Sequence, residues 1–508
     1  MARYKPQERN GLFVPVVLSE QLVPGSFAFA LNYLVDQELD LSALDARFRN
    51  DATGASAYDP RALLKIVLLG YSQGLISSRA IEAACAHNVQ FMAIGGGAQP
   101  SHAHVAKFVC SLGPQIKDVF AQVLMTCDAQ GLIGRDLFAI DGVKLPSNAS
   151  KERSGTHAEL AHRASRLEAA ADKIVRLHQS QDSSTQPQAL DEQRQARVQA
   201  LRQEAARTRE FLSTRAKRLN RKGQELKTNV TDPDSAKMAT SKGVIQGYAA
   251  QAAVDSAHQV IVAADVLGSG SEQAALLPMV EQSAPYRDTN TVITADAGYH
   301  SDANIEQLQA RGIPAMIADN HMRQRDERFA EQAKHKAKDD PLYDKQSTTE
   351  AKPVKRFAPS DFTFNDDNTA ICPAGKVLTT SGAVHVMPSG LRWQRYEARA
   401  QDCKACAMRD QCTRKSEANR GRQVARFEPK ETNPLHASER MRRAIDSERG
   451  RQIYSRRIGT VEPVFANIRH NKKLTRFNLR GQAKVNTQWH LFCLVHNIEK
   501  IAHSGWRP

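Results

Sequence analysis

Two apolar runs, far apart in the chain, lead into an aspartate in the same way. Residues 137–140 are followed by Asp141 and Gly142, and residues 292–295 are followed by Asp296. A short apolar run bounded by turn residues predicts a buried strand. Singly, each aspartate is a common turn or cap residue. Together they predict a sheet that carries carboxylates where its strands end, which is where open α/β sheets bind ligands.

The pattern between residues 240 and 320 supports such a sheet. Two alternating apolar runs flank the sequence DSAH and predict a hairpin, and they are followed by helix, strand, helix and strand signals. With the strand at 137–145, this alternation predicts a mixed α/β sheet with helices packed on it.

The rest of the chain is predominantly helical. Asp59 and Pro60 are a helix N-cap and first-turn pair, and the N-terminal region predicts several short helices that either read DNA as a helix-turn-helix or serve only as a scaffold. Apolar residues three and four apart predict a charged helical hairpin after residue 151. The predicted organisation is a helical N-terminal domain for DNA binding or assembly (1–128), a first part of the core (129–150), the inserted hairpin (151–228), core strands (229–320), an insertion with a cysteine cluster (321–435) and C-terminal helices that complete the core (436–508).

Charge and hydropathy limit the functional classes. The 508 residues carry 70 Lys and Arg against 55 Asp and Glu, a formal net charge of +15. Such an excess indicates a polyanionic partner, most simply nucleic acid, although it also serves solubility. The N-terminus leads into no apolar signal segment, and no apolar run approaches the length of a bilayer span. We therefore expect a soluble cytoplasmic protein.

A hard divalent cation needs more than two carboxylates, and the best third candidate is Glu462. It lies among basic residues in YSRRIGTVEPVFANIRHNKK, directly before Pro463, which predicts a helix start or a kink at this carboxylate. Pairing with the neighbouring arginines is the competing interpretation. Asp265, which also ends an apolar strand, is the chief rival.

These segments resemble the DDE transposases of bacterial insertion sequences. AIDGVKLPSNASK looks like the segment of the first catalytic aspartate, and ITADAGYHS is similar to the D-x-G-Y motif of the second. Tyr454, Arg457, Glu462 and Arg469 resemble the tyrosine-arginine-glutamate-lysine signature of one branch. Four residues separate Arg457 from Glu462 where that signature has three, and position 469 is arginine where it has lysine.

The resemblance implies an RNase H-like core and a definite chemistry. Asp141, Asp296 and Glu462 would be catalytic and would bind Mg²⁺ or Mn²⁺. The residues expected to hold phosphates of double-stranded DNA are Tyr454, Arg457, Arg469, Lys472 and Lys473. The implied function is cleavage at the ends of a transposable element and strand transfer, by a homodimer that joins two ends. A DNA-binding protein without catalysis and an RNase H-like nuclease are the alternatives.

Four cysteines form a second constellation. Cys372, Cys403, Cys406 and Cys412 follow the pattern C-x30-C-x2-C-x5-C, with CPAGK at the first position. A pair spaced C-x2-C with two further cysteines is typical of structural zinc. A free-thiol cluster and an iron-sulfur site are the alternatives. Four thiolates leave no open metal position, so a zinc ion here would brace the insertion.

Overall fold

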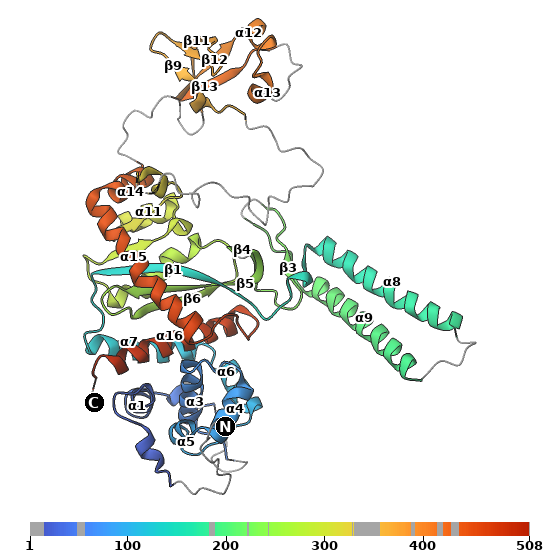
Figure 1. Cartoon of the computed structure of the whole chain (residues 1–508), viewed down its shortest axis with the longest axis vertical. Coiled ribbons are helices and arrows are strands. Elements are labelled where there is room, and N and C mark those ends of the chain that lie inside the picture. Colours follow the sequence, from blue (N-terminus) through green and yellow to red (C-terminus); the bar gives the residue numbers. More distant parts are fainter. Residues whose placement is uncertain are drawn as a thin grey trace, which may run out of the picture. The chain divides into compact units, whose positions relative to one another are not determined.

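The structure of the protein is a computed structural model. It describes residues 15–47, 56–181, 188–220, 223–241, 243–327, 329, 356–387, 392–413, 420–427 and 436–506. The chain divides into two compact units, the first formed by Met1–Tyr343 with Ala437–Pro508 and the second by Asp344–His436. Figure 1 labels most of their helices and many of their strands. In the described part of the chain, no helix is both long and apolar enough to cross a membrane.

The first unit is built on a mixed sheet. Its strand order is β4-β5-β1-β7-β8, with β6 also paired to β5. The strands are β1 (Leu137–Pro146), β4 (Ala236–Thr240), β5 (Gly243–Asp255), β6 (Ile261–Leu267), β7 (Val292–Ala295) and β8 (Ala315–Ile317). β1, β7 and β8 run parallel, whereas β5 is antiparallel to β1, β4 and β6. This arrangement confirms the predicted mixed α/β fold class and the hairpin around DSAH.

Strand β1 does not end at the opening aspartate. Its antiparallel pairing with β5 continues to Pro146, opposite Gly247, so the Asp141–Gly142 pair lies inside the strand and forms no turn. The strand predicted over 137–145 is therefore observed, whereas the expected end or turn at Asp141 was wrong, because only the pairing with β7 stops there. The parallel pairing of β1 with β7 ends at Ile140, opposite Ala295.

Helices cover the sheet and extend from it (Figure 1). The N-terminal helices are α1 (Phe27–Tyr33), α2 (Ser42–Asp45), α3 (Pro60–Ser72), α4 (Ser78–His87), α5 (Val89–Ile94), α6 (His102–Ser111) and α7 (Gln115–Ala129). The core helices are α10 (Leu276–Gln282), α11 (Asp302–Ala310), α14 (Ala437–Asp446), α15 (Glu448–Ala466) and α16 (Gln482–His503). As predicted, Asp59 caps α3 by accepting from the Arg61 N–H at 2.7 Å, with Pro60 in the first turn.

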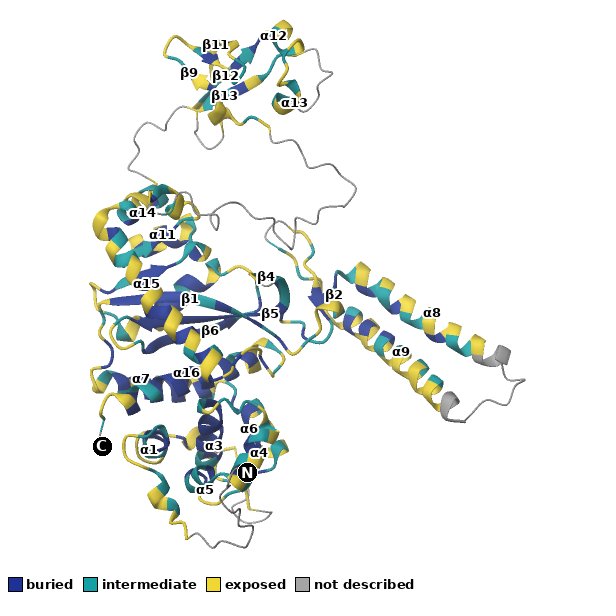
Figure 2. Cartoon of the chain, viewed as in Figure 1, coloured by how far each residue is buried: buried dark blue, intermediate teal, exposed yellow. Residues whose placement is uncertain are grey.

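The C-terminal helix α16 joins the N-terminal helices to the sheet. It packs on β6 on one side and on α1, α3 and α7 on the other, and it is buried along most of its length (Figure 2). Phe492 stacks on Tyr71 of α3 with the ring centroids 4.6 Å apart. Because the two regions share one hydrophobic core, the orientation of the N-terminal helices is coupled to the sheet.

The charged insertion is an antiparallel helical pair. Helices α8 (His157–Gln181) and α9 (Gln188–Thr214) extend away from the sheet (Figure 1). Their contact surface buries Leu160, Ala164 and Ala205. The short strands β2 (Ser154–Gly155) and β3 (Thr228–Asn229) pair at the base of the hairpin. The apolar seam predicted from the sequence is therefore the surface along which the helices pack.

The second unit is small. Its strands form an antiparallel sheet in the order β13-β12-β11-β10-β9. Its elements are β9 (Thr363–Phe364), β10 (Thr369–Ile371), β11 (Val377–Val386), β12 (Arg392–Ala398), α12 (Ala400–Lys404), α13 (Arg409–Cys412) and β13 (Gln423–Phe427). The first part of the insertion predicted at 321–435 lies mostly outside the described residues.

Candidate active site

Asp141 and Asp296 lie side by side at one edge of the parallel strands. Ile140 of β1 is the register partner of Ala295 of β7, so the next residue on each strand is an aspartate. Both carboxylates are half-buried. Because parallel strands present their carboxyl ends at the same edge, two distant sequence motifs meet at a single point of the sheet.

The turn after β7 fixes the direction of the second aspartate. Asp296 caps the helical turn Ala297–Tyr299, where its Oδ1 accepts from the Gly298 N–H at 2.9 Å. Tyr299 is fully buried and its hydroxyl donates to Oε1 of Gln251 on β5. The tyrosine of the D-A-G-Y segment therefore anchors the aspartate-bearing turn to the neighbouring strand.

A guanidinium from α15 faces the first aspartate. Arg457 Nη1 donates to Asp141 Oδ2 at 2.8 Å, with side-chain exposures of 10% and 19%. Burial is the main cause that raises the pKa of Asp141, and Asp296 raises it further, against the lowering effect of Arg457. The Arg457 guanidinium also lies over the Tyr454 ring, 5.7 Å from its centroid. The structure thus brings Tyr454 and Arg457 of the predicted signature to the two aspartates.

Glu272, which belongs to none of the sequence motifs above, also faces this pair. It is half-buried in the segment between β6 and α10. Burial chiefly raises its pKa, the nearby Lys144 lowers it, and the negative charges of Asp296 and Asp141 raise it again. β6 runs in the same direction as β1, since each is antiparallel to β5, so its carboxyl end reaches the same edge of the sheet. The sequence does not reveal that Glu272 reaches this edge, because the direction of β6 relative to β1 depends on how the strands pair.

Two glycines make room for these carboxylates. A Cβ on Gly142 would lie 2.4 Å from Gln251 Nε2 and 2.9 Å from Glu272 Oε1. A Cβ on Gly298 would lie 2.9 Å from Glu272 Oε2 and 3.0 Å from Asp296 Oδ1. Gln251 Nε2 is buried and has no partner at hydrogen-bond geometry among the described residues.

Asp141, Asp296 and Glu272, with Gly142 and Gly298 beside them, form a cradle of carboxylates. This cradle has the chemistry of a site for a hard divalent cation. Carboxylate oxygens are the ligands that Mg²⁺ prefers, and glycines let them approach closely. As placed, no three His, Cys, Asp or Glu side chains of the described chain are grouped closely enough to hold a metal ion. The donor set fits a divalent cation, and Arg457 supplies a positive charge to Asp141 in this structure.

The structure does not bring Glu462 to the two aspartates. Helix α15 starts at Glu448 and continues through Pro463, so the expected helix start at Glu462 is not observed. Glu462 lies five positions after Arg457, which places it about 140° around the helix axis from Arg457. Glu462 is exposed, whereas Arg457 is buried. The rival Asp265 accepts from Asn486 of α16 at 3.0 Å.

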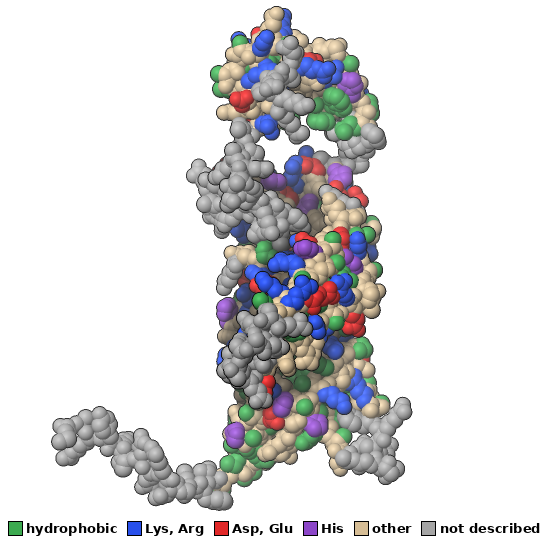
Figure 3. Space-filling view, turned by 90° about the vertical axis from the view of Figure 1, so that its right-hand side faces the viewer, with side chains coloured by type: hydrophobic (Ala, Val, Ile, Leu, Met, Phe, Trp, Pro, Cys, Tyr) green, Lys and Arg blue, Asp and Glu red, His purple; other side chains and the backbone are tan. Residues whose placement is uncertain are grey.

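The predicted phosphate-binding residues differ in their surroundings. Lys472 is 4% exposed and its ammonium pairs with Glu499 of α16, which corrects its assignment as a DNA contact because that charge is already used inside the fold. Arg469 is half-buried with its Nε lacking a partner among the described residues, and Lys473 is exposed. Figure 3 shows Lys and Arg side chains gathered on one face of the first unit, with acidic side chains between them.

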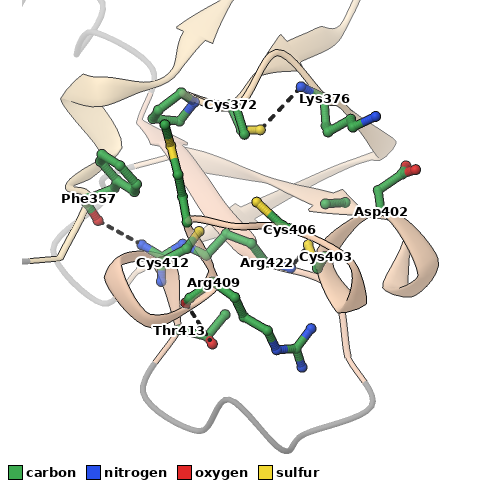
Figure 4. A pocket seen from close by; sticks show the side chains of 14 residues that line it. Phe357, Cys372, Lys376, Asp402, Cys403, Cys406, Arg409, Cys412, Thr413 and Arg422 are labelled. Atoms are coloured by element: carbon green, nitrogen blue, oxygen red, sulfur yellow. Dashed lines mark hydrogen bonds between the residues drawn. The ribbon is translucent and has the colours of Figure 1, made fainter.

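The four clustered cysteines come together in the second unit. Cys372 follows β10, Cys403 and Cys412 lie on α12 and α13, and Cys406 lies between these helices. All four line one cavity, and Figure 4 shows their sulfurs turned toward a common space. Burial is the main cause that raises the pKa of Cys412. The positive charge of Arg422 lowers this pKa, and the other three thiols raise it.

Comparison with known proteins identifies two regions. Residues 371–502, which include the cysteine cluster and α15, match the family model described as "Transposase DDE domain". Residues 16–110, the N-terminal helices, match the model described as "Transposase domain (DUF772)". No curated protein matches the chain. Two separate regions of the chain are therefore similar to transposase domains, one of them to a DDE domain.

Proposed function

We propose that this protein is the transposase of an insertion sequence, which binds the terminal inverted repeats of the element, cleaves DNA there and joins the freed ends to a target. One observation carries the proposal. Asp141 and Asp296 lie side by side where the parallel pairing of β1 with β7 ends, with Arg457 paired to Asp141, in a chain that matches transposase domains at both ends.

The reaction is an in-line displacement at phosphorus. Water forms a bond to phosphorus while the bond to the 3′ oxygen breaks, which releases a 3′-hydroxyl and leaves a 5′-phosphate. That hydroxyl then attacks a phosphodiester of the target and displaces a target 3′ oxygen. A divalent cation at the site, Mg²⁺ or Mn²⁺, would supply an acidic water and neutralise charge on the phosphate.

The residues of the cradle have separate tasks in this proposal. Asp141 and Asp296 would hold the cation. Arg457 orients Asp141 through its 2.8 Å hydrogen bond, and Tyr299 fixes the turn that carries Asp296. Because these contacts are already formed, little reorganisation remains when the substrate arrives.

Two residues compete for the place of the third carboxylate. The resemblance to DDE transposases favours Glu462. The local geometry favours Glu272, whose oxygens lie within 3 Å of the Cβ positions of both Gly142 and Gly298. Glu462 would need α15 to turn or shift when DNA binds, whereas Glu272 already faces the pair.

DNA binding is supported by charge. The net charge of +15 and the exposed Lys473 and half-buried Arg469 near the end of α15 suit contacts to phosphates. Joining two ends requires both to be held at once, so we propose a homodimer in the DNA complex.

The test is cleavage of labelled DNA that carries the inverted repeats flanking the gene, with Mg²⁺ and with EDTA. We expect Asp141→Asn and Asp296→Asn to lose cleavage and strand transfer by at least 10³-fold while retaining DNA binding in a gel-shift assay. Asp265→Asn is the matched control, since its carboxylate bonds Asn486 on α16, and it should remain active.

The two candidates for the third carboxylate are separated in the same assay. Glu462→Gln and Glu272→Gln are measured in parallel, and the variant that loses cleavage as severely as Asp141→Asn identifies the ligand. Binding without cleavage by the parent protein would favour the non-catalytic alternative. Cleavage without joining, or without preference for the repeats, would favour a nuclease. Full activity of Asp296→Asn would refute the catalytic assignment.

A further inference from the structure

The second unit has too little hydrophobic core to explain a stable fold. Its described buried core consists of Phe362, Ala370, Leu378, Tyr396, Ala398 and Val424. Small domains with such cores need disulfides, a metal or a partner to be stable. Cys372, Cys403 and Cys412 pack directly against this core, so a cross-link at the cysteines would act where it is needed.

The turn that carries Cys372 resembles a metal-binding knuckle in its hydrogen bonds. The Lys376 N–H donates to Cys372 Sγ at 3.2 Å (Figure 4). The turn is closed by the Gly375 N–H, which donates to the Cys372 carbonyl at 2.8 Å, and Gly375 has a φ of +73°. A backbone N–H that donates to sulfur stabilises the thiolate, which is the form that binds metal.

The C-x2-C pair, Cys403 and Cys406, has a similar contact. The Arg422 N–H, just before β13, donates to Cys403 Sγ at 3.3 Å. The Cys406 N–H donates to the Cys403 carbonyl at 3.4 Å, so the C-x2-C pair is held in a tight turn. Thus two of the four sulfurs, from separate parts of the unit, each accept a backbone N–H.

The cavity that the four cysteines line is small. Its volume is about 20 Å³, close to one water-sized probe, and it is lined by all four cysteines. All eight cysteines of the chain are free thiols in this structure, so no disulfide links the four cysteines of this cavity.

We propose that Cys372, Cys403, Cys406 and Cys412 bind one Zn²⁺ ion that holds the second unit together. Four thiolates form a closed tetrahedral site, so the ion is structural. Since the sulfurs are not yet at metal-ligand spacing in this structure, binding draws them inward, to about 2.3 Å from the ion. The ion would link the turn after β10 to α12 and α13, which the small core holds weakly.

The experiment is metal analysis of the purified full-length chain by mass spectrometry, after dialysis against a weak chelator. We expect about one zinc per chain. Replacing zinc with Co²⁺ should give the intense thiolate-to-metal charge-transfer bands and the visible bands of tetrahedral sulfur coordination. Cys412→Ser should lose the zinc or bind it far more weakly, whereas Cys110→Ser, a half-buried cysteine on α6, should retain it.

Several results would overturn the zinc site. These are a chain without zinc whose four thiols react rapidly with a thiol reagent, a stoichiometric iron content, or a disulfide among these cysteines in peptide mapping. A Cys412→Ser variant that keeps its full zinc would also refute it. Because no DNA is involved, this outcome is independent of the transposase proposal.

Discussion

Arg457 and Arg456 are adjacent on α15 and each pairs with an aspartate, which offers a controlled test of the candidate site. Arg457 pairs with Asp141 at 2.8 Å, with side chains only 10% and 19% exposed. Arg456 pairs with Asp136 at 2.6 Å, with side chains 48% and 65% exposed. We expect Arg457→Met to destabilise the first unit strongly and Arg456→Met to have little effect.

The magnitudes follow from burial. With charge centres about 4 Å apart, Coulomb's law gives about 4 kcal/mol at an effective dielectric constant of about 20. Removing one partner of a buried pair leaves the other charge unpaired, at a cost of about 3–5 kcal/mol. The exposed pair of Arg456 is screened by solvent and contributes about 0–1 kcal/mol.

The measurement is urea unfolding in EDTA, followed by the fluorescence of buried Trp489. Its indole N–H donates to the Gln251 carbonyl at 2.9 Å, so it reports on the strand beside the site. A Trp393→Phe background removes the tryptophan of the second unit, so the signal comes from Trp489 and Trp506 of the first unit.

A double-mutant cycle isolates the interaction. If the pair is the cause, Asp141→Asn should restore most of the stability that Arg457→Met loses, since the carboxylate left unpaired by Arg457→Met is then absent. A cost below about 1 kcal/mol for Arg457→Met, or additive effects in the cycle, would show that this pair is not a coupled buried interaction.

Two further predictions concern the cradle and α16. Gly298→Ala should weaken Mn²⁺ binding in titration calorimetry and slow cleavage, because its Cβ would lie 2.9 Å from Glu272 Oε2. The control is Gly459→Ala in α15, whose added Cβ would meet no atom within 4 Å. This variant should bind Mn²⁺ normally and be more stable than the parent protein by about 0.5–1 kcal/mol. An unchanged Mn²⁺ affinity in Gly298→Ala would contradict the cradle. Burial lowers the pKa of His490 and His496 from 6.5 to about 4. These folded-state values are depressed, so the unfolded chain takes up protons first as the pH falls below 6.5, and stability should decrease by about 3 kcal/mol per histidine by about pH 4. Unfolding midpoints measured from pH 7 to 4 should show this loss, which His496→Gln should reduce; a flat profile would exclude it.

Local patterns were enough to predict several parts of the structure. The period of the apolar residues gave the hairpin helices, and Asp59 with Pro60 marked the start of α3, because capping and amphipathicity depend on near neighbours in the chain. The strand pattern gave the mixed sheet. The two aspartates were found because each directly follows a strongly apolar run.

Pairing and helix rotation could not be predicted in this way. The sequence suggested that the strand of Asp141 ends there, but the end of a strand depends on its partners, and β5 pairs beyond it to Pro146. Glu462 looked well placed among arginines, yet its position on α15 is set by which face of the helix packs on the sheet. The sequence predicted Lys472 as a phosphate contact, but in the fold its ammonium pairs with Glu499 of α16.

The sequence by itself determined the fold class, the positions of the two aspartates and the four cysteines, and the excess of positive charge. Tertiary structure decided which side chains share a site. It placed Glu272 beside Asp141 and Asp296, set Arg457 against Asp141 and gathered the cysteines around one cavity. The physical reason is that residue type and local period are properties of a segment, whereas burial, charge pairing and metal coordination depend on contacts between segments far apart in the chain.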